Sequence, residues 1–335
     1  MKKLFWLIIV ISVIGISCKN STPKSAKESS DVEPFQIAFY NVENLFDTLN
    51  TPKKNDGEYT PESKKQWNSD KYYTKLDRIT QVLSSIDSNG NLIGVGLAEI
   101  ENLNVLEGLV STGILKERGF KIIHKESPDF RGIDVAFIYN PRYFTPSNSQ
   151  WLFVDLNDGT KTTRDILRVD GKVKNAEVSI YVNHWPSRYG GQEKSDPKRR
   201  AAAKRLRENL DSLQTKAPNQ MVLIMGDLND YPTNGSVLEV LGADSVPTSK
   251  LYNATWDIHK QEGHGTHCYR GHWGVLDHII VSNNMIPLID TVYAHKREFM
   301  CYQNKKGELL PSRSFSGKKY FAGYSDHLPI VLKFK

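Results

Sequence analysis

Close to the C-terminus stands the stretch Tyr324-Ser-Asp-His-Leu-Pro-Ile330, in which a polar tripeptide leads into an apolar run of strand length. Polar residues at the junction of a strand and a loop are a usual place for catalytic side chains. An isolated Asp-His pair is more often only a hydrogen-bonded turn, since a short motif is a hypothesis and no more. The stretch therefore gains meaning only together with other clusters of the same kind.

Comparable clusters precede it along the chain. They are Phe39-Tyr-Asn-Val-Glu-Asn44, Leu97-Ala-Glu-Ile-Glu101, Val182-Asn-His-Trp-Pro186, Met225-Gly-Asp-Leu-Asn229 and Leu276-Asp-His-Ile279. Each cluster follows or interrupts an apolar, β-prone run. We therefore place each of them where a strand gives way to a loop.

The order Asn, Glu, His, Asp-x-Asn, Asp, Ser-Asp-His resembles the endonuclease/exonuclease/phosphatase superfamily. These metal-dependent phosphodiesterases are typified by DNase I, abasic-site endonucleases, sphingomyelinases and inositol polyphosphate phosphatases. The resemblance extends from about residue 35 to the end of the chain. It implies an α/β fold in which two mixed β-sheets stack between outer helices, the four-layer DNase I-like sandwich.

Hydrophobic pattern alone also indicates an α/β protein, because strands this apolar belong to sheets that are covered on both faces. Strands are predicted at 35–40, 92–98, 121–124, 134–139, 178–183, 221–225, 276–281 and 328–334. Helical periodicity covers 71–85, 103–118 and 197–213. The pattern fits other α/β folds equally well, so the sandwich rests on the resemblance.

The resemblance implies a metal site with Glu99 as principal ligand, assisted by Glu43 and Asp326. Strand alternation would place Asn41 and Glu43 on one face, which suggests joint action. Glu101, two residues after Glu99, could share in the site. Oxygen ligands suit Mg²⁺ or Mn²⁺, and the lack of clustered Cys or a His-x-x-x-His pattern argues against a zinc cage.

The catalytic residues implied by the resemblance are two carboxylates, an amide and two histidines. Asp227 would orient or deprotonate the attacking water, while Asn229 would donate to a phosphoryl oxygen. Asp277 would orient His327, which stabilises developing charge. His184 matches the histidine of the DNase I and sphingomyelinase branches, for which Asp134 is a candidate carboxylate partner.

Phosphate contacts are expected from Asn41, Asn183 and Arg131. A further basic run begins at Asp196, which with Pro197 would start a helix. A charge run of this kind is usually a solvated helix face. The alternative is that Arg199 or Arg200 holds phosphate.

The first residues read as a targeting segment. Lys2-Lys3 and the apolar run 4–16 are typical of a secretory signal too short to span a bilayer. Because a cysteine follows directly, residues 1–17 resemble a lipoprotein signal peptide, after which Cys18 carries lipid; a cleaved, unlipidated secreted protein is the alternative. Residues 18–34 are Ser/Lys/Glu-rich and indicate a disordered tether, and 35–335 form one catalytic domain. We expect a monomer in the bacterial cell envelope, attached to the membrane only through its lipid.

Function is thus predicted to be Mg²⁺-dependent hydrolysis of phosphodiesters. The stretch Asn41-Val-Glu-Asn-Leu-Phe46 resembles secreted bacterial nucleases, so a DNA endonuclease is the first expectation. A phosphodiesterase or phosphatase acting on a lipid headgroup or small organophosphate is the alternative. The net charge of +6 suits a polyanionic substrate without deciding between them. Cys268 and Cys301 could pair or remain free.

Overall fold

The computed structural model describes residues 34–156, 159 and 162–335. The expected signal peptide at 1–17 lies outside the described residues, as does the expected tether at 18–34 except for Pro34. Within the described ranges, no helix combines the length and apolar character needed to cross a membrane.

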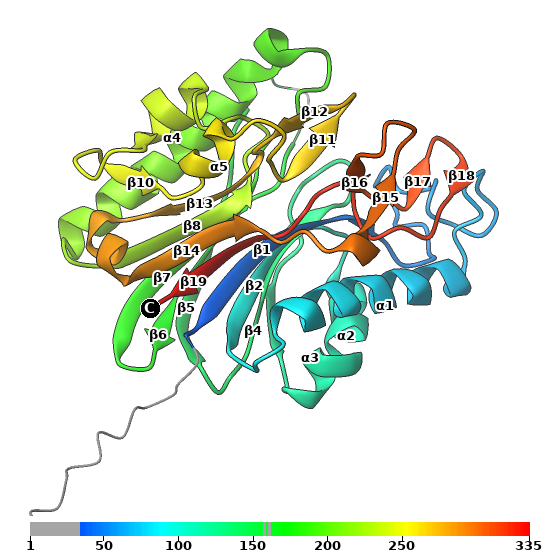
Figure 1. Cartoon of the computed structure of the whole chain (residues 1–335), viewed down its shortest axis with the longest axis horizontal. Coiled ribbons are helices and arrows are strands. Elements are labelled where there is room, and N and C mark those ends of the chain that lie inside the picture. Colours follow the sequence, from blue (N-terminus) through cyan, green and yellow to red (C-terminus); the bar gives the residue numbers. More distant parts are fainter. Residues whose placement is uncertain (1–33, 157–158, 160–161) are drawn as a thin grey trace, which may run out of the picture. The chain divides into compact units, whose positions relative to one another are not determined.

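The first sheet is mixed and has β1 and β2 at its centre (Figure 1). Strands β1 and β2 run parallel, whereas the other neighbours in the sheet are antiparallel. Across the sheet the order is β14 (Ile289–Ala294), β19 (Ile330–Phe334), β1 (Gln36–Leu45), β2 (Leu92–Ile100), β4 (Asp134–Tyr139) and β3 (Lys121–His124).

The second sheet is also mixed. Here β7 and β8 are parallel, as are the short β9 and β10, and the remaining pairs are antiparallel. Its order is β5 (Phe144–Leu152), β6 (Ile166–Val173), β7 (Ala176–His184), β8 (Met221–Asp227), β13 (Asp277–Val281), β10 (Leu251–Asn253) and β9 (Ala243–Asp244).

The two sheets stack face to face because their strands alternate between two apolar surfaces. In β1, Ile37 and Phe39 join the core between the sheets, whereas Ala38 and Tyr40 join the core beneath the helices of the first sheet. A third apolar cluster lies between the second sheet and α4. The four-layer sandwich implied by the resemblance is therefore confirmed.

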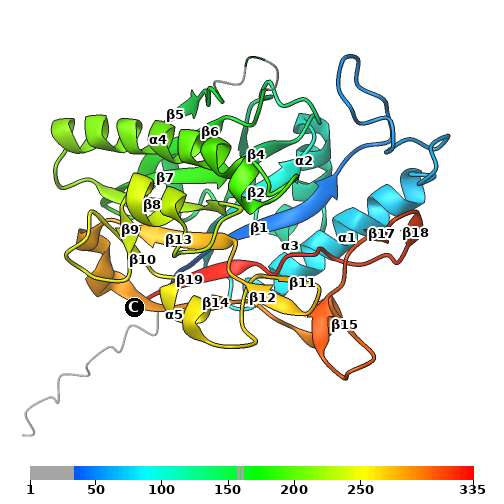
Figure 2. The same ribbon diagram turned by 90° about the horizontal axis from the view of Figure 1, so that it is seen from above.

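Helices cover the outer face of each sheet (Figure 2). The first sheet is covered by α1 (Ser69–Ile86), α2 (Leu103–Val110) and α3 (Gly113–Glu117). The second is covered by α4 (Gln192–Lys216) and the π-helix η1 (Ser236–Leu241). The remaining helical turns are α5 (Trp256–Lys260), η2 (Asn283–Leu288) and η3 (Glu298–Met300).

Two helix predictions need correction. The single helix predicted over 103–118 is split after Ser111, since Gly113 adopts a φ of 47°, which ends helical continuation. Helix α4 begins at Gln192, with Gly191 rather than Asp196 as its N-cap, so Pro197 lies inside it.

Three short hairpins complete the domain: β11–β12 (His267–Tyr269, His272–Gly274), β15–β16 (Cys301–Gln303, Leu309–Pro311) and β17–β18 (Phe315–Ser316, Lys319–Tyr320). In both views β17–β18 lies beside α1 (Figures 1 and 2). A separate apolar cluster joins this hairpin to the segment between β1 and α1, through Phe46, Tyr59, Trp67, Ile133 and Phe315. Of the described cysteines, Cys268 and Cys301 are both free thiols.

Candidate active site

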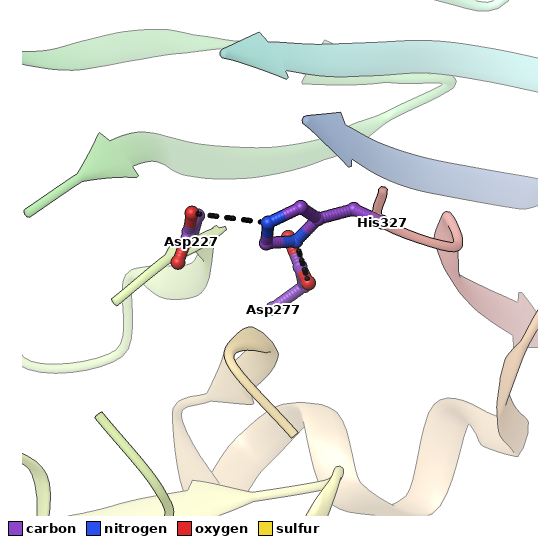
Figure 3. A group of neighbouring side chains, drawn as sticks. All are labelled: Asp227, Asp277 and His327. Carbon is purple, nitrogen blue, oxygen red and sulfur yellow. Dashed lines mark hydrogen bonds and ion pairs between the residues drawn. The ribbon is translucent and has the colours of Figure 1, made fainter. Parts of the chain in front are cut away.

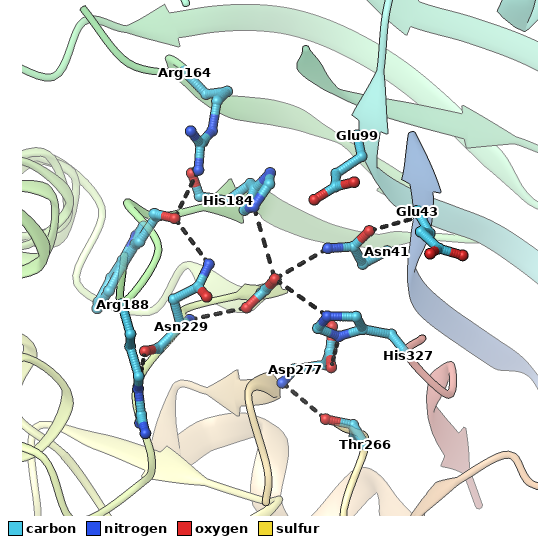
Figure 4. A network of polar contacts seen from close by, with 12 residues as sticks. Asn41, Glu43, Glu99, Arg164, His184, Arg188, Asn229, Thr266, Asp277 and His327 are labelled. Atoms are coloured by element: carbon cyan, nitrogen blue, oxygen red, sulfur yellow. Dashed lines mark hydrogen bonds and ion pairs between the residues drawn. The ribbon is translucent and has the colours of Figure 1, made fainter. Parts of the chain in front are cut away.

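The predicted site residues lie where the central strands of both sheets end (Figure 4). Parallel pairing of β1 with β2, and of β7 with β8, sends the carboxyl ends of each pair toward the same edge. Side chains that follow these strands consequently meet there, although the chain separates them widely.

Asp227 occupies the centre of this arrangement. As the last residue of β8 it is paired with His184 on β7 and with Asp277 on β13. The preceding residue must be glycine, because a Cβ on Gly226 would lie 2.3 Å from the carbonyl oxygen of Asn183. Tight packing of β7 against β8 therefore aligns the three functional side chains in neighbouring strands.

The Asp227 carboxylate is held by several groups (Figure 4). Its Oδ2 accepts a hydrogen bond from Asn41 Nδ2 at 3.0 Å, and its Oδ1 accepts one from the backbone N–H of Asn229 at 2.9 Å. The same Oδ2 lies 3.7 Å from His184 Nε2 and 3.8 Å from His327 Nε2. Burial raises the pKa of Asp227 to about 7, opposed by the charge of His327. A carboxyl group with this pKa exchanges protons near neutral pH.

His327 and Asp277 form a close pair (Figure 3). His327 Nδ1 lies 2.7 Å from Asp277 Oδ2, and the Asp277 amide donates to Thr266 Oγ1 at 3.1 Å. Burial alone would lower the pKa of His327, but Asp277 and Asp227 outweigh it and raise the pKa well above its ordinary value. His327 is thus a charged imidazolium at neutral pH.

Ser325 fixes this histidine against the first sheet. Its hydroxyl donates to the Asn41 carbonyl at 2.7 Å and accepts from the His327 amide at 3.0 Å. One serine therefore joins the C-terminal tripeptide to β1, which is the reason that the two segments act as one site.

Two of the predicted metal ligands are bridged by an arginine. Arg313 Nε lies 3.2 Å from Glu43 Oε1, and its Nη2 lies 2.5 Å from Asp326 Oδ2. Burial, with Asp326, raises the pKa of Glu43 to about 7. For Asp326, burial acts in the same direction, but His327 and Arg313 outweigh it and lower the pKa.

The third predicted ligand, Glu99, accepts a hydrogen bond from the Asn44 amide at its Oε2 (2.9 Å). Glu43, Asn44 and Glu99 have φ values of 53°, 57° and 64°, and the β1–β2 register shifts between Asn41 and Leu45. These left-handed residues cost of order 1–3 kcal/mol each. The expectation that Asn41 and Glu43 share a strand face is wrong, because the irregular backbone turns Asn41 toward Asp227 and Glu43 toward Arg313.

The donor chemistry fits a divalent metal. Glu43, Glu99 and Asp326 offer only carboxylate oxygens, the ligands preferred by hard cations. Arg313 lies between two of these carboxylates and supplies positive charge to both. Among the described residues, the group whose potential ligand atoms all lie within 4.8 Å of one another is instead Asp227, Asp277 and His327, but a protonated His327 makes this set a poor metal site.

His184 is buried and neutral. Burial, together with the charge of Arg164, lowers its pKa well below the ordinary value. Its Nδ1 has no hydrogen-bond partner among the described residues. Asp134, the candidate partner, pairs instead with His124 at 3.3 Å, because these two residues lie on the neighbouring strands β4 and β3.

Contrary to the prediction, the Asn183 side chain does not face the site. Its side-chain Nδ2 donates to the Met225 carbonyl at 3.2 Å, and its side-chain Oδ1 accepts from Trp185 Nε1 at 3.1 Å. The residue is 0% exposed. Strand alternation turns Asn183 away from the face that His184 occupies. The structure therefore gives Asn183 the role of supporting the end of β7.

The other predicted anion contacts differ from one another. Arg131 lies near the site, where its Nη2 donates to Asn44 Oδ1 at 2.6 Å. Arg199 is fully buried against Asp230 at 2.7 Å, and Arg200 pairs with Asp196 and Glu239. Neither arginine of α4 is available to phosphate, so that alternative is corrected.

Glu101 also lies elsewhere: its carboxylate accepts from the Asp47 amide and from Thr51 Oγ1. It therefore anchors the loop after β1. The possibility that it shares in the metal site is not supported by this position.

Several supporting residues were missed from the sequence. Arg164 donates to the carbonyls of His184 and Trp185 at 3.1 and 2.7 Å, and Arg188 donates to the Asn229 carbonyl at 2.7 Å. The His267 ring lies beside the His327 ring, tilted against it, with centroids 4.8 Å apart. These contacts depend on residues that are neighbours only in the folded protein, and no local sequence pattern predicts them.

One known protein family matches most of the chain. A family model described as "Endonuclease/Exonuclease/phosphatase family" matches residues 36–335. No curated protein matches the sequence.

Similar solved structures share the fold at low sequence identity. A mannosyl-6-phosphatase of Bacteroides thetaiotaomicron has a TM-score of 0.57 and 14% identity, over 90% of this chain and 99% of that one. The human Nocturnin catalytic domain with a bound sulfate anion has a TM-score of 0.56 and 17% identity, over 90% and 94%. D. rerio TDP2 with a single-strand DNA product has a TM-score of 0.52 and 16% identity, over 90% and 98%.

Proposed function

Since the chain belongs to the endonuclease/exonuclease/phosphatase family, which hydrolyses phosphodiesters or phosphate esters, we propose that it is a Mg²⁺-dependent DNA endonuclease. The observation that carries the proposal is the position of Asp227 among Asn41, His184, Asn229 and His327. A base, hydrogen-bond donors and a positive charge surround one point, which is what water attack on a phosphodiester requires.

Asp227 takes the proton of the attacking water in this mechanism. Its pKa of about 7 lets it accept that proton at neutral pH and release it afterwards. Asn41 Nδ2 and the backbone N–H of Asn229 each donate to one oxygen of the Asp227 carboxylate, so the base has one orientation. Preorganised positioning of this kind lowers the barrier without a cost during the reaction.

His327 donates a hydrogen bond from Nε2 to a phosphoryl oxygen. The Nδ1 contact with Asp277 keeps the ring charged and fixes its orientation. Neutral His184 contributes a second Nε2 donor beside the same oxygen of Asp227. Both donors therefore meet negative charge where it develops.

Glu99, Glu43 and Asp326 would hold Mg²⁺, which when bound supplies positive charge to the phosphoryl and departing oxygens. The all-oxygen donor set supports Mg²⁺, or Mn²⁺, over a softer metal. Outside the domain, we propose that Cys18 carries a lipid and that the enzyme works as a monomer in the bacterial cell envelope. Loss of lipid label in Cys18→Ser tests this, and unchanged lipidation or soluble export of the wild type contradicts it.

A second candidate is a phosphatase or phosphodiesterase acting on a lipid headgroup or small organophosphate. The similarity to the structure of a mannosyl-6-phosphatase favours it, since the substrate that this name denotes is a small phosphate ester. Both candidates use the same reacting groups, so only the identity of the substrate that is hydrolysed separates them.

The deciding experiment incubates the purified protein and Mg²⁺ with supercoiled plasmid, sphingomyelin, mannose 6-phosphate and bis-p-nitrophenyl phosphate. Nicking of plasmid that EDTA and Asp227→Asn both abolish supports the endonuclease. Release of phosphocholine or inorganic phosphate without nicking selects the second candidate. Turnover of none of the four would overturn both.

A further inference from the structure

A polar pocket of about 230 Å³ borders the predicted metal ligands. Glu43 and Arg313 line it on the side of the site, and its other charged lining residues are Arg131, Glu58 and Lys65. The volume is several times the roughly 30 Å³ that one water molecule occupies. The pocket is thus large enough for a chemical group attached to the reacting phosphate.

Lys65 is fixed above an aromatic floor in this pocket. Its Nζ lies 4.0 Å from the ring centre of Tyr59 and 5.3 Å from that of Phe315. The lysine side chain is only 15% exposed and also contacts Glu58 at 3.0 Å. Cation–π contacts and burial of its aliphatic stem hold the ammonium group in one position.

The buried aromatic cluster explains why this position is maintained. Tyr59 stacks on Phe46 with centroids 4.1 Å apart, and Trp67 Nε1 donates to the Phe46 carbonyl at 3.1 Å. Phe315 approaches Trp67 from the β17–β18 hairpin at 6.0 Å. The segment that carries Lys65 and the segment that carries Arg313 are consequently locked together beside Glu43.

One cation of the pocket, Arg131, is left to bind an anion. Lys65 pairs with Glu58 at 3.0 Å and Arg313 pairs with Glu43 and Asp326 at 3.2 and 2.5 Å, whereas Arg131 forms no ion pair with a carboxylate of the described residues. Glu43 is already engaged by Arg313 and by the Ser314 amide, at 3.2 and 2.7 Å. Fixed cations in a recess raise the local concentration of negatively charged ligands.

A quaternary ammonium headgroup is disfavoured for the same reason. Aromatic faces recognise choline through cation–π contacts. Here Lys65 already covers Tyr59 and Phe315, and Lys71 lies 5.1 Å from the Tyr320 ring centre. A choline group would have to displace a resident cation and remain beside it.

We propose that this pocket is a subsite for a second phosphate of the substrate, next to the phosphate that is hydrolysed. The inference rests on the proposed hydrolysis of phosphate esters and narrows its substrates to those that carry at least two phosphate groups. A nucleic-acid strand supplies such a neighbour, and so does a small bisphosphate. The test separates these two sources.

The test compares kcat/KM for matched substrates with one and two phosphates. One arm uses a thymidine dinucleotide with and without a terminal phosphate at either end; the other uses fructose 6-phosphate and fructose 1,6-bisphosphate. The two-phosphate member is expected to be preferred in the arm that represents the natural source. Lys65→Met should reduce that preference about tenfold or more, the loss expected for one charge-assisted hydrogen bond.

Matched variants separate binding from folding. Lys65→Arg keeps the charge and should retain most of the preference, and Lys204→Met removes an exposed cation (75% exposed) from α4 and should leave it unchanged. Arg131→Gln should lower the preference as Lys65→Met does, and it replaces that variant if thermal melting shows misfolding. An unchanged ratio in folded Lys65→Met or Arg131→Gln overturns the subsite.

Failure of the proposed function has a different signature. If the wild type hydrolyses no substrate in either arm, calorimetric titration with pyrophosphate reads the pocket directly. Weaker pyrophosphate binding by Lys65→Met than by Lys204→Met then supports the subsite alone. Equal binding by the two variants overturns it.

Discussion

His327 Nδ1 lies 2.7 Å from Asp277 Oδ2, and Asp277 is itself the cross-strand partner of Asp227. Sheet pairing therefore sets the distance between the imidazolium and the base. Replacing Asp277 by Asn keeps the shape but removes the charge that keeps His327 protonated. We expect kcat to fall about 10²–10⁴-fold, the range for a misplaced acid or base.

Nuclear magnetic resonance titration of His327 checks the cause of that loss. In Asp277→Asn the imidazole should titrate at lower pH than in the wild type, because its closest anion is gone. Asp290→Asn, on the exposed face of β14, is the control and should alter neither kcat nor the titration. Equal His327 titration curves in wild type and Asp277→Asn would rule out the pairing as the cause.

The pH profile follows from Asp227. Burial raises its pKa to about 7, and the base must be deprotonated to accept a proton. The kcat/KM of the wild type should therefore rise as pH increases through about 7 and then level off. Asp227→Asn should lose several orders of magnitude and this limb of the profile. A wild-type profile that is flat between about pH 5 and about pH 8 would exclude Asp227 as the base.

Metal removal should reveal the role of Arg313. The arginine pairs with Glu43 and Asp326 when no metal is bound, so Arg313→Gln leaves the buried Glu43 and the partly exposed Asp326 without this cation. We expect this variant to melt at lower temperature in EDTA and to gain more from added Mg²⁺ than the wild type gains, because ligand binding stabilises the folded state. Scanning calorimetry at several Mg²⁺ concentrations measures both. The same Mg²⁺-dependent gain in the two proteins would contradict the prediction.

Glu99 should set the amount of metal that the reaction needs. Because Glu99→Gln removes one charged oxygen ligand, activity should require about 10-fold or more Mg²⁺ for half-saturation, with less effect at saturating metal. Glu101→Gln is a matched control two residues away, where the carboxylate serves Asp47 and Thr51. A larger metal requirement in Glu101→Gln than in Glu99→Gln would reverse the assignment.

Much of the fold could be predicted because its central strands are strongly apolar. Every predicted strand overlaps an observed one, but β5, β6 and β14 were missed. The edge strand β5 is half exposed and carries polar residues, so it lacks the apolar pattern. The polar clusters could be placed at strand ends for the same reason. The left-handed backbone of Glu43 and Glu99 could not be predicted, because neither residue type favours it.

The ion pairs of the site could not be predicted from the sequence for another reason. Arg313 reaches Glu43 across 270 residues of sequence, and His124 takes the Asp134 carboxylate through strand pairing. Such partners are decided by which strands become neighbours. A motif names the reacting side chain, whereas the fold decides which charges surround it.

Stability should fall in mild acid because neutral histidines are buried outside the reacting groups. His278 is fully buried, with Nε2 2.9 Å from the Asp230 carbonyl and Nδ1 3.2 Å from Asn253 Nδ2. Burial lowers its pKa to about 4, below the ordinary 6.5 that applies to the unfolded chain. Between these values the unfolded state binds the proton and the folded state does not.

The free energy of unfolding should therefore decrease as pH falls from about 6.5 to about 4, by up to ~3 kcal/mol from this residue. Urea unfolding at about pH 7 and about pH 5 should show a smaller loss of unfolding free energy in His278→Gln than in the wild type. An equal loss in both proteins would assign the acid sensitivity to other groups.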